Sequence, residues 1–271
     1  MIEVIVVDDG STDDTMTILR SYGDQISRYQ KQNGGPASAR NFGIKMAKGE
    51  LIALIDHDDL WLKEKLEKQV QIISEDQEIG MIFSDSYIMQ NGKTLKNTCF
   101  NNVKPYRGMV FNKLYLRNFV PNLTTLTRKT CFEKMGYFDQ TGRMMTTDDY
   151  DMWLQIAANY KIEYVNEPLA VFRLHETNFS NRINFFCEDI ITTLNENAKR
   201  YPEEASKLGS KKNRRIADLY YKIGKNYYNQ FELKLALDKV ICALKIHPIH
   251  FKCILLGLWI QIVILKKRIG R

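Results

Sequence analysis

The sequence predicts an α/β domain followed by a helical region. Two short apolar runs, residues 2–7 and 51–55, each end at a cluster of aspartates, and helical patterns lie between them. Strands buried in a parallel sheet are almost continuously apolar, and ligands of α/β sheets bind at the carboxyl ends of the strands. From residue 181 onward the chain shows only helical patterns. We therefore expect an α/β sheet with its site at the strand ends over residues 1–180, and a helical region over residues 181–271.

The first helices follow directly from these strands. Helical spacing of apolar residues predicts a helix over residues 12–22, with Ser11, Thr12 or Asp13 as its N-cap. A second helix is expected over residues 37–48, where Gly49 ends it.

The remaining elements of the domain are predicted in the same way. An amphipathic pattern over residues 62–74 indicates a helix, and Asn91-Gly92 is typical of a tight turn. Residues 97–106 are polar and irregular, which predicts a loop. The further expected elements are short strands at 81–84, 86–89, 162–165 and 169–174 and a helix at 147–159.

The composition indicates a globular intracellular protein. Apolar residues make up 44% of the chain and charged residues 26%, which suffices for a buried core. The five cysteines are scattered, odd in number and without a Cys-x-x-Cys pair, a pattern of reduced thiols rather than of a disulfide framework or zinc site. The N-terminus lacks the pattern of a signal peptide, so we expect a cytoplasmic location.

Charge is distributed unevenly between the two regions. Residues 1–180 contain 21 Lys and Arg against 24 Asp and Glu, whereas residues 181–271 contain 18 against 8. A basic helical region favours an anionic partner, either a membrane surface or an acidic lipid-linked acceptor. The alternative is a solvated helical face without a partner. No nucleic-acid module is present in the sequence, so we expect no nucleic-acid partner.

The helical region contains one stretch that matches a tetratricopeptide repeat. Small, aromatic and closing residues of a 34-residue repeat stand at the expected positions, namely Ala217, Gly224, Tyr227, Ala236, Ala243 and Pro248. A lone repeat cannot bury its own apolar face. We therefore expect a helical hairpin at about residues 217–250 that packs against the rest of the protein.

The last apolar segment, residues 253–265, precedes the basic residues Lys266, Lys267, Arg268 and Arg271. Thirteen residues are too few to cross a bilayer, which needs about 20. The segment suits either a helix buried against the hairpin or one that lies in the interface of an anionic membrane, with residues 253–271 as the membrane contact.

Two acidic clusters follow the predicted strands. In Asp8-Asp9-Gly10-Ser11, a carboxylate at a strand end can bind a ribose or nucleobase, although the same residues could simply cap a helix. In Asp56-His57-Asp58-Asp59, three carboxylates within four residues repel one another unless a cation lies among them. Mg²⁺ and Mn²⁺ prefer such oxygen ligands and bridge them to phosphates, whereas the alternative is a solvated acidic turn.

Two later segments also carry candidate residues. Asp148-Asp149 opens a helix, where like charges and apolar neighbours raise the pKa of a carboxyl and suit it to act as a general base. The alternative is simple charge complementarity with the helix dipole. Arg173 and His175 alternate, so they share one strand face and could bind a diphosphate or its metal.

Together, these motifs resemble the inverting glycosyltransferases of family 2. The resemblance covers about residues 1–180 and depends on the order of several segments. These are Ile5–Asp13 with its Asp-Asp-Gly-Ser, Asn33-Gly34-Gly35, Ala39-Arg40-Asn41 with Gly43, Asp56–Asp59, Gly136-Tyr137-Phe138-Asp139, Asp148-Asp149 before Trp153, and Phe172–His175.

The resemblance implies a GT-A fold, which is a Rossmann-like mixed sheet with helices on both faces. Its nucleotide-sugar half would cover about residues 1–95 and its acceptor half about 96–180. It implies that Asp8, Asp9, Arg40, Asp56 and Arg173 bind the donor, usually a UDP-sugar.

The resemblance also implies the roles of the remaining residues. Asp58, with Asp56 and His175, would bind a divalent metal, Mn²⁺ or Mg²⁺. Asp149 would be the general base that deprotonates a glycan or lipid-linked acceptor for direct, inverting attack on the sugar. Such enzymes serve cell-surface polysaccharide biosynthesis, here as a protein peripheral to the inner face of the membrane.

The sequence departs from this family in two places. Members ordinarily begin one strand and one helix earlier, so we expect the sheet to lack a central strand and to expose an unpaired edge. Gln155 stands where members often carry arginine. Two alternatives remain at this point: a nucleotidyltransferase, although no Gly-rich phosphate loop is present near the start, and a non-catalytic relative that acts as an interaction module.

Overall fold

The computed structural model describes residues 2–175 and 182–269, except for the side chains of Asn102 and of residues 267–269. It divides into two compact units, which are described separately here. Unit 1 comprises residues 1–114 and 118–175, and unit 2 comprises residues 115–117 and 176–271. The domain boundary expected at residue 180 lies outside the described residues.

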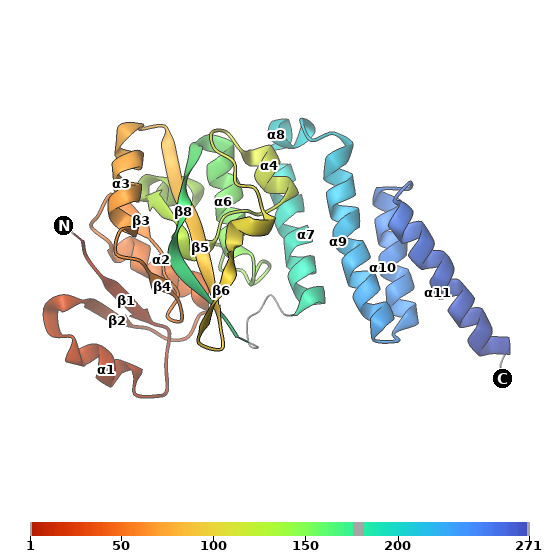
Figure 1. Cartoon of the computed structure of the whole chain (residues 1–271), viewed down its shortest axis with the longest axis horizontal. Coiled ribbons are helices and arrows are strands. Elements are labelled where there is room, and N and C mark those ends of the chain that lie inside the picture. The colour runs from red at the N-terminus through yellow and green to blue at the C-terminus, as the bar shows by residue number, and fades with distance from the viewer. Residues whose placement is uncertain (1, 176–181, 270–271) are drawn as a thin grey trace. The chain divides into compact units, whose positions relative to one another are not determined.

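Unit 1 contains the strands, and the described part of unit 2 is helical (Figure 1). The strands are β1 (Ile5–Asp8), β2 (Ser27–Gln30), β3 (Leu51–Ala53), β4 (Leu60–Trp61), β5 (Ile79–Gln90), β6 (Lys93–Thr98), β7 (Leu126–Arg128) and β8 (Lys161–Leu174). The helices up to β8 are α1 (Thr15–Ser21), α2 (Pro36–Met46), α3 (Lys65–Glu75), α4 (Phe111–Leu116), α5 (Lys129–Met135) and α6 (Asp148–Asn159), with short 3-10 helices η1 (Gly23–Gln25), η2 (Cys99–Asn102) and η3 (Asn122–Thr124). The last helices are α7 (Ile183–Arg200), α8 (Pro202–Ser206), α9 (Ser210–Asn229), α10 (Leu233–Ile246) and α11 (Phe251–Ile269).

The main sheet is mixed, as the sequence predicts. Its strand order is β3-β7-β5-β8-β4, and β6 pairs with β5 outside this path. β5 and β8 are parallel, whereas β3, β4, β6 and β7 pair with their neighbours in antiparallel orientation. Ile82 belongs to an apolar cluster with Ile73 of α3. The next residue, Phe83, packs its ring against Phe100 and Phe119 instead, because successive side chains of a strand point to opposite faces.

The two longest strands differ from the expectation. The pieces predicted at 81–84 and 86–89 form the single strand β5, and those at 162–165 and 169–174 form the single strand β8. Asp85 of β5 lies opposite Pro168 of β8, where the register shifts. Proline has no N–H to donate to the ladder, so the sequence shows a break there. The ladder resumes beyond this irregularity, which keeps both strands continuous.

The start of unit 1 forms a sheet of its own. β1 pairs in parallel with β2, and within the described residues neither strand joins the main sheet. The prediction of a fully buried strand over residues 2–7 is wrong, since Ile2 is 70% exposed and Val4 49%. β2 was not predicted, because Ser-Arg-Tyr-Gln has no apolar run. Among the described residues, β2 is the ladder partner of β1, and the expectation of a missing central strand stays a prediction.

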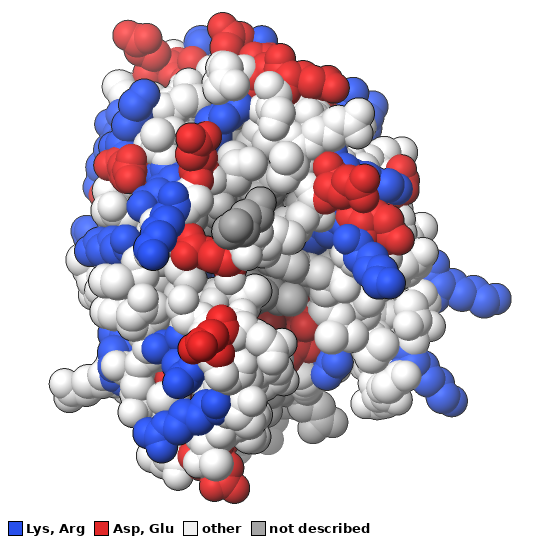
Figure 2. All heavy atoms as spheres, turned by 90° about the vertical axis from the view of Figure 1, so that its left-hand side faces the viewer, with Lys and Arg blue, Asp and Glu red and all other residues white. Residues whose placement is uncertain are grey.

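Two further local features bear on the predictions. Asn91 and Gly92 have positive φ values of 51° and 74° and connect β5 to β6, which confirms the predicted turn. The loop predicted over residues 97–106 is partly wrong, because β6 extends to Thr98 and η2 follows it. On the face of unit 1 shown in Figure 2, acidic and basic side chains are interspersed, in keeping with its nearly balanced charge.

Unit 2 is held together by close helix contacts. Ala217, Ala236 and Ala243 are buried where α9 meets α10, and a Cβ at Gly224 would lie 3.2 Å from the carbonyl oxygen of Ala236. Small residues at these positions allow the two helices to approach closely. Lys239 of α10 forms an ion pair with Glu188 of α7 at 2.6 Å. None of the helices that the structure describes is long and apolar enough to cross a bilayer.

Candidate active site

Asp8 and Asp9 hold the loop that follows β1. Asp8 accepts hydrogen bonds from the Ser11 amide and the Gln30 side chain, both at 3.0 Å, and its pKa is lowered chiefly by the hydrogen bonds from Ser11. Both carboxylates lie at the carboxyl end of β1, where the sequence places a donor-binding site.

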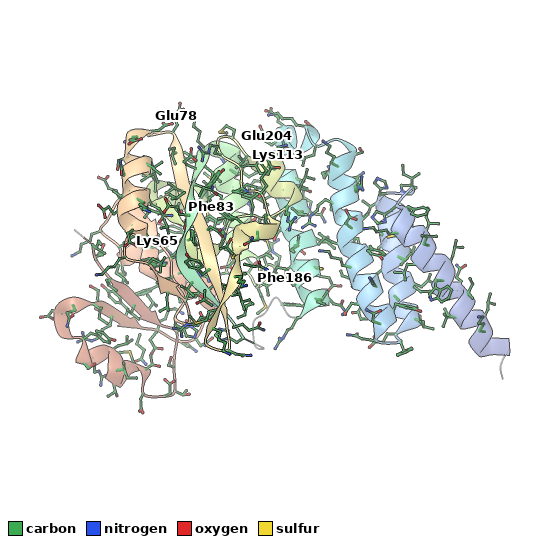
Figure 3. All side chains as sticks on the ribbon, viewed as in Figure 1. Lys65, Glu78, Phe83, Lys113, Phe186 and Glu204 are labelled. Carbon is green, nitrogen blue, oxygen red and sulfur yellow. The ribbon has the colours of Figure 1, made fainter. Side chains whose placement is uncertain are left out.

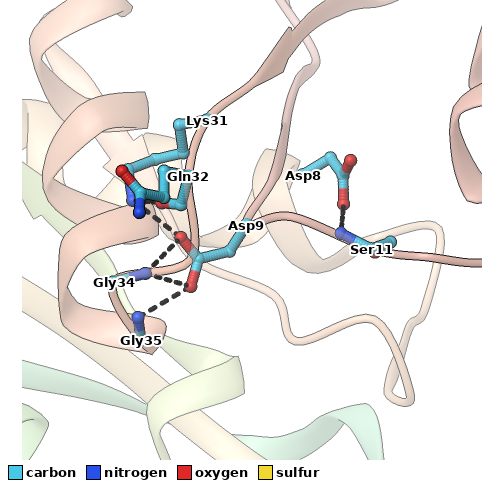
Figure 4. A network of polar contacts seen from close by, with 7 residues as sticks. All are labelled: Asp8, Asp9, Ser11, Lys31, Gln32, Gly34 and Gly35. Carbon is cyan, nitrogen blue, oxygen red and sulfur yellow. Dashed lines mark hydrogen bonds and ion pairs between the residues drawn. The ribbon is translucent and has the colours of Figure 1, made fainter.

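Asp9 ties this loop to the segment before α2 (Figure 4). Its carboxylate accepts hydrogen bonds from the Lys31 ammonium at 2.7 Å, the Gly34 amide at 3.1 Å and the Gly35 amide at 2.7 Å. Burial opposes ionisation here, but these donors outweigh it and lower the pKa of Asp9. Asp9 is therefore anionic at neutral pH, and its role toward a nucleobase stays a prediction.

Arg40 on α2 joins two distant acidic segments. Its Nη2 lies 2.9 Å from Oδ1 of Asp56, and its Nη1 lies 2.9 Å from Oδ2 of Asp148. The next residue along α2, Asn41, exchanges two 2.9 Å hydrogen bonds with the backbone of Phe138 and so fixes the position of the helix. The predicted donor-binding arginine thus lies between the Asp56 turn and the start of α6.

Asp149 lies beside this pair and has a perturbed acidity. Burial, and then repulsion by Asp148, raise the pKa of Asp149 to about 7. Burial also raises the pKa of Asp148, while the neighbouring Arg40 opposes that rise. A carboxyl group with a pKa near 7 is suited to exchange a proton at neutral pH, as a general base must.

The turn between β3 and β4 is joined to the end of β8. Oδ1 of Asp59 accepts a hydrogen bond from the Arg173 amide at 3.0 Å, and burial raises the pKa of Asp59 to about 6. Oδ2 of Asp58 lies 2.7 Å from Nε2 of His175. Within the described part of the chain, the buried Nε of Arg173 has no hydrogen-bond partner, so it is a donor available to an anion.

The structure brings together only part of the predicted metal set. Asp58 and His175 are in contact, whereas Asp56 faces Arg40. Among the residues described, no three His, Cys, Asp or Glu side chains are close enough to hold a metal. The carboxylate of Asp58 still fits Mg²⁺ or Mn²⁺ when the ion also binds substrate phosphates, because Mg²⁺ sites often use only one or two carboxylates together with phosphate oxygens.

From the sequence, Asp59 was named only as one of the three carboxylates of the acidic turn, and Lys65 was not named. Asp59 connects the acidic turn to β8, and Lys65 is fully buried at the start of α3 (Figure 3). The Lys65 ammonium lies 4.3 Å from the centre of the Trp61 ring and donates to Gln69 at 2.8 Å, and burial lowers its pKa to about 7. A lysine near the start of an amphipathic helix gives no sequence signal of burial, and the hydrogen bond from Arg173 to Asp59 joins residues that are far apart in the chain.

Comparison with known proteins identifies the family. The family model described as glycosyl transferase family 2 matches residues 1–142, which is more than half of the chain. The chain belongs to glycosyl transferase family 2. The resemblance stated from the sequence motifs is thereby confirmed.

Glycosyltransferases of several organisms are similar to most of this chain. An uncharacterized glycosyltransferase of Rickettsia prowazekii is 31% identical over 87% of this chain and 75% of its own length. The Bacillus subtilis glycosyltransferase TuaG, named for teichuronic acid biosynthesis, is 30% identical over 66% of this chain and 70% of its own. The chain spans 57% of the length of the similar Rickettsia typhi glycosyltransferase and 32% of the Rickettsia felis one.

Solved structures with the same fold include S. aureus TarS, residues 1–349. Its TM-score is 0.62 at 20% identity, covering 91% of this chain and 72% of the TarS chain. The mannosyltransferase of Pyrobaculum calidifontis, in complex with GDP-Man and Mn²⁺, has a TM-score of 0.58 at 18% identity over 90% of this chain and 66% of its own. Both likenesses confirm the predicted GT-A-like fold of this family 2 protein.

Proposed function

We propose that this chain transfers a sugar from a nucleotide-sugar, a UDP-sugar, to a glycan or lipid-linked acceptor in cell-surface polysaccharide biosynthesis. The transfer is metal-dependent and inverts the anomeric centre. It takes place at the cytoplasmic face of a membrane, with which the protein associates peripherally.

The observation that carries this proposal is the position of Arg40 between two acidic segments. Asp56 and Asp148 each lie 2.9 Å from its guanidinium, and Asp149 follows Asp148 directly. A donor held at the Asp56 turn would therefore lie close to the carboxyl that accepts the acceptor's proton. A transferase needs this proximity, because a well-placed base and nucleophile turn a bimolecular step into an effectively unimolecular one.

The donor side is supported by the groups around the acidic turn. Asp58 and His175 are the residues that would hold a divalent ion together with the diphosphate, and the unpaired Nε of Arg173 suits a phosphate oxygen. When bound, such an ion neutralises the charge that develops on the departing nucleoside diphosphate. TarS in complex with UDP and the mannosyltransferase with GDP-Man and Mn²⁺ are precedents for these ligands in this fold.

The chemical step is assigned to Asp149. Its carboxylate takes the proton of the acceptor hydroxyl while that oxygen forms a bond to the anomeric carbon, and the bond to the diphosphate breaks on the opposite side. A carboxyl with a pKa of about 7 is ionised in a sufficient fraction of molecules at neutral pH to accept this proton. Arg40 positions the pair by holding Asp148.

A hydrolysis assay tests the function without knowledge of the acceptor. The full chain is incubated with a panel of UDP-sugars, with Mn²⁺, with Mg²⁺ or with EDTA, and the release of UDP is measured. We expect release from at least one donor that requires the metal and is lost in Asp149→Asn. UDP release that persists in EDTA would contradict the metal assignment, and no release from any donor would contradict UDP-sugars as the donor class.

A further inference from the structure

Helix α11 is apolar on two opposite sides, and only one of them is covered within unit 2. On the inner side, Cys253 and Ile260 are fully buried in a cluster with α9 and α10. A Cβ at Gly257 would lie 3.2 Å from Cγ1 of Val240, so this side is in close contact with α10. α11 is therefore anchored to the hairpin, as Figure 1 shows for the blue end of the chain.

The other side of α11, here called the outer face, is an exposed apolar stripe. It consists of Phe251, Leu255, Leu258, Ile262 and Leu265, which are between 44% and 69% exposed. Their spacing alternates between four and three residues, which places them in one line along the helix. A helix that is apolar on all sides is normally covered on all sides by protein or lipid.

Trp259 borders the outer face and has the surroundings of an interfacial residue. It is 53% exposed, and its indole N–H donates a 2.6 Å hydrogen bond to the Tyr228 hydroxyl. Tryptophan and tyrosine concentrate at membrane–water interfaces, because their rings are apolar while one edge forms hydrogen bonds. Two such residues beside an apolar stripe fit a lipid interface.

The charges around the outer face decide between a membrane and a second copy of the chain. From residue 233 to the end, the sequence contains eight Lys and Arg and a single acidic residue, Asp238, and one of these cations, Lys239, is paired with Glu188 of α7. Two copies that met through this face would bring their basic residues together with almost no carboxylates to pair with them, whereas anionic lipid headgroups complement the charge. The side chains of Lys267 and Arg268 and the whole of Arg271 lie outside the described residues, so only their sequence enters here.

We propose that the outer face of α11 binds the surface of an anionic membrane, with the helix lying in the plane of the interface and not crossing it. This inference rests on the proposed function, and it identifies the surface through which the protein would bind the membrane. The chemistry that recognises the partner is the combination of an apolar stripe, bordering aromatic residues and surrounding cations, which is the pattern of an interfacial helix. The inner face keeps α11 attached to the hairpin, so binding would bring unit 2 to the membrane without unfolding it.

Vesicle sedimentation with the full chain tests the proposal. Vesicles of phosphatidylcholine with phosphatidylglycerol are compared with vesicles of phosphatidylcholine alone. We expect the chain to sediment with the anionic vesicles only, and less so as NaCl rises from about 0.05 to about 0.5 M, because salt screens the attraction. The variant with Leu255→Ser, Leu258→Ser and Ile262→Ser should bind about tenfold more weakly or worse, since binding scales with buried apolar area.

The matched control is Ile241→Ser, which removes an exposed apolar side chain from α10 instead. This variant should bind as the unchanged protein does. A second readout follows Trp259 directly: brominated lipids should quench its fluorescence, and the quenching should disappear in Trp259→Phe. Trp61 and Trp153 remain in that variant and report any background.

Three results would overturn the proposal: no sedimentation with anionic vesicles, equal binding by the triple variant, or a stable dimer in solution that the triple variant abolishes. The last result would assign the outer face to a second copy of the chain. Release of UDP from UDP-sugars is measured on the same variants without lipid. Because the triple variant lies outside the acidic site, its release of UDP should be unchanged. If the unchanged protein releases UDP but does not sediment with anionic vesicles, this inference alone fails; if it sediments but releases no UDP, the proposed function alone fails.

Discussion

Arg40 makes the candidate site from residues that are far apart in the chain. It contacts Asp56, 16 residues away, and Asp148, 108 residues away. Its positive charge favours the ionised form of Asp148. Burial, and then repulsion by the negative charge of Asp148, raise the pKa of Asp149. The ion pair with Arg40 suits Asp148 to a structural role, and the pKa of about 7 suits Asp149 to proton transfer.

At this scale we predict that Asp149→Asn lowers the rate of transfer by about 10²–10⁴-fold, the usual contribution of a general base. Binding of UDP, measured by calorimetry, should stay near normal because the substitution keeps the shape of the side chain. Transfer by the unchanged protein should fall as the pH drops below about 7, since Asp149 must be ionised to accept a proton.

The stability of the same variant provides a control. The folded-state pKa of Asp149 lies above its unfolded value of 3.8, so the folded protein loses stability as the pH rises through about 7. Asparagine has no such charge, and Asp149→Asn should therefore melt at a higher temperature than the unchanged protein at pH 8. Near-normal turnover in this variant would show that the base lies elsewhere, with Asp148 next to be tested.

We also predict that Asp58→Ala abolishes the metal-dependent part of UDP binding and leaves the fold intact. Asp58 lies in a turn and contacts His175, not the core. Calorimetry with UDP, with and without Mn²⁺, measures the effect. His57→Ala is the matched control, because His57 is an exposed residue of the same turn. If Asp58→Ala binds UDP and Mn²⁺ with unchanged affinity, the metal assignment fails.

Among the elements, β5 and β8 connect the core of unit 1 to its site. The side chains of Ile82 and Phe83 on β5 pack on opposite faces of the sheet. β8 ends at Arg173 and Leu174, beside the acidic turn. Helices α5 and α6 approach the start of β5 at Gly80. A Cβ at this glycine would lie 2.6 Å from Cβ of Tyr160 and 3.0 Å from Sγ of Cys131, closer than real Cβ contacts allow.

We therefore predict that Gly80→Val destabilises the protein by about 1–3 kcal/mol, the usual cost of overpacking a core. Chemical denaturation monitored by circular dichroism measures it. Gly49→Ala is the control: a Cβ there would have its nearest neighbour, the carbonyl oxygen of Leu51, at an ordinary 3.5 Å. Equal stability of Gly80→Val and the unchanged protein would mean that α5 and α6 do not pack on β5 as described.

At the scale of the whole molecule, the described strands are divided between two sheets of unequal size. The main sheet has six strands, while β1 and β2 form a pair. A two-stranded sheet is marginally stable by itself, and residues near β1 such as Ile2 and Val4 are exposed. Two of the candidate donor-binding aspartates belong to this region, because Asp8 is the last residue of β1 and Asp9 follows it, so the order of the smaller sheet affects the donor side of the site.

We predict that backbone amides of β1 and β2 exchange with deuterium much faster than those of β5 and β8, because local opening of a small, half-exposed sheet costs less free energy. Hydrogen exchange measured by mass spectrometry resolves the two sheets. Addition of UDP with Mn²⁺ should slow exchange at residues 5–9 if Asp8 and Asp9 contact the donor. Uniform protection across both sheets would contradict this division of stability.

Much of the local structure follows from sequence alone. The carboxyl end of β1 and the turn after β3 were found from apolar runs that end at aspartates, and α6 from the helical pattern after Thr147. The Asn91-Gly92 turn was found because few other pairs adopt two positive φ values easily. These features depend on residues that are neighbours in the chain, so the sequence shows them directly.

The assembly of the site was decided by tertiary structure. The sequence marked Arg40, Asp56 and Asp149 as candidates, but only the fold brings α2, the acidic turn and the start of α6 to one guanidinium. Likewise, the separate strands expected at 162–165 and 169–174 form one strand, β8, which pairs in parallel with β5. The separation of β1 and β2 from the main sheet and the exposed outer face of α11 also depend on partners distant in sequence. Such contacts arise from the burial and pairing of whole elements, which no short stretch of sequence specifies.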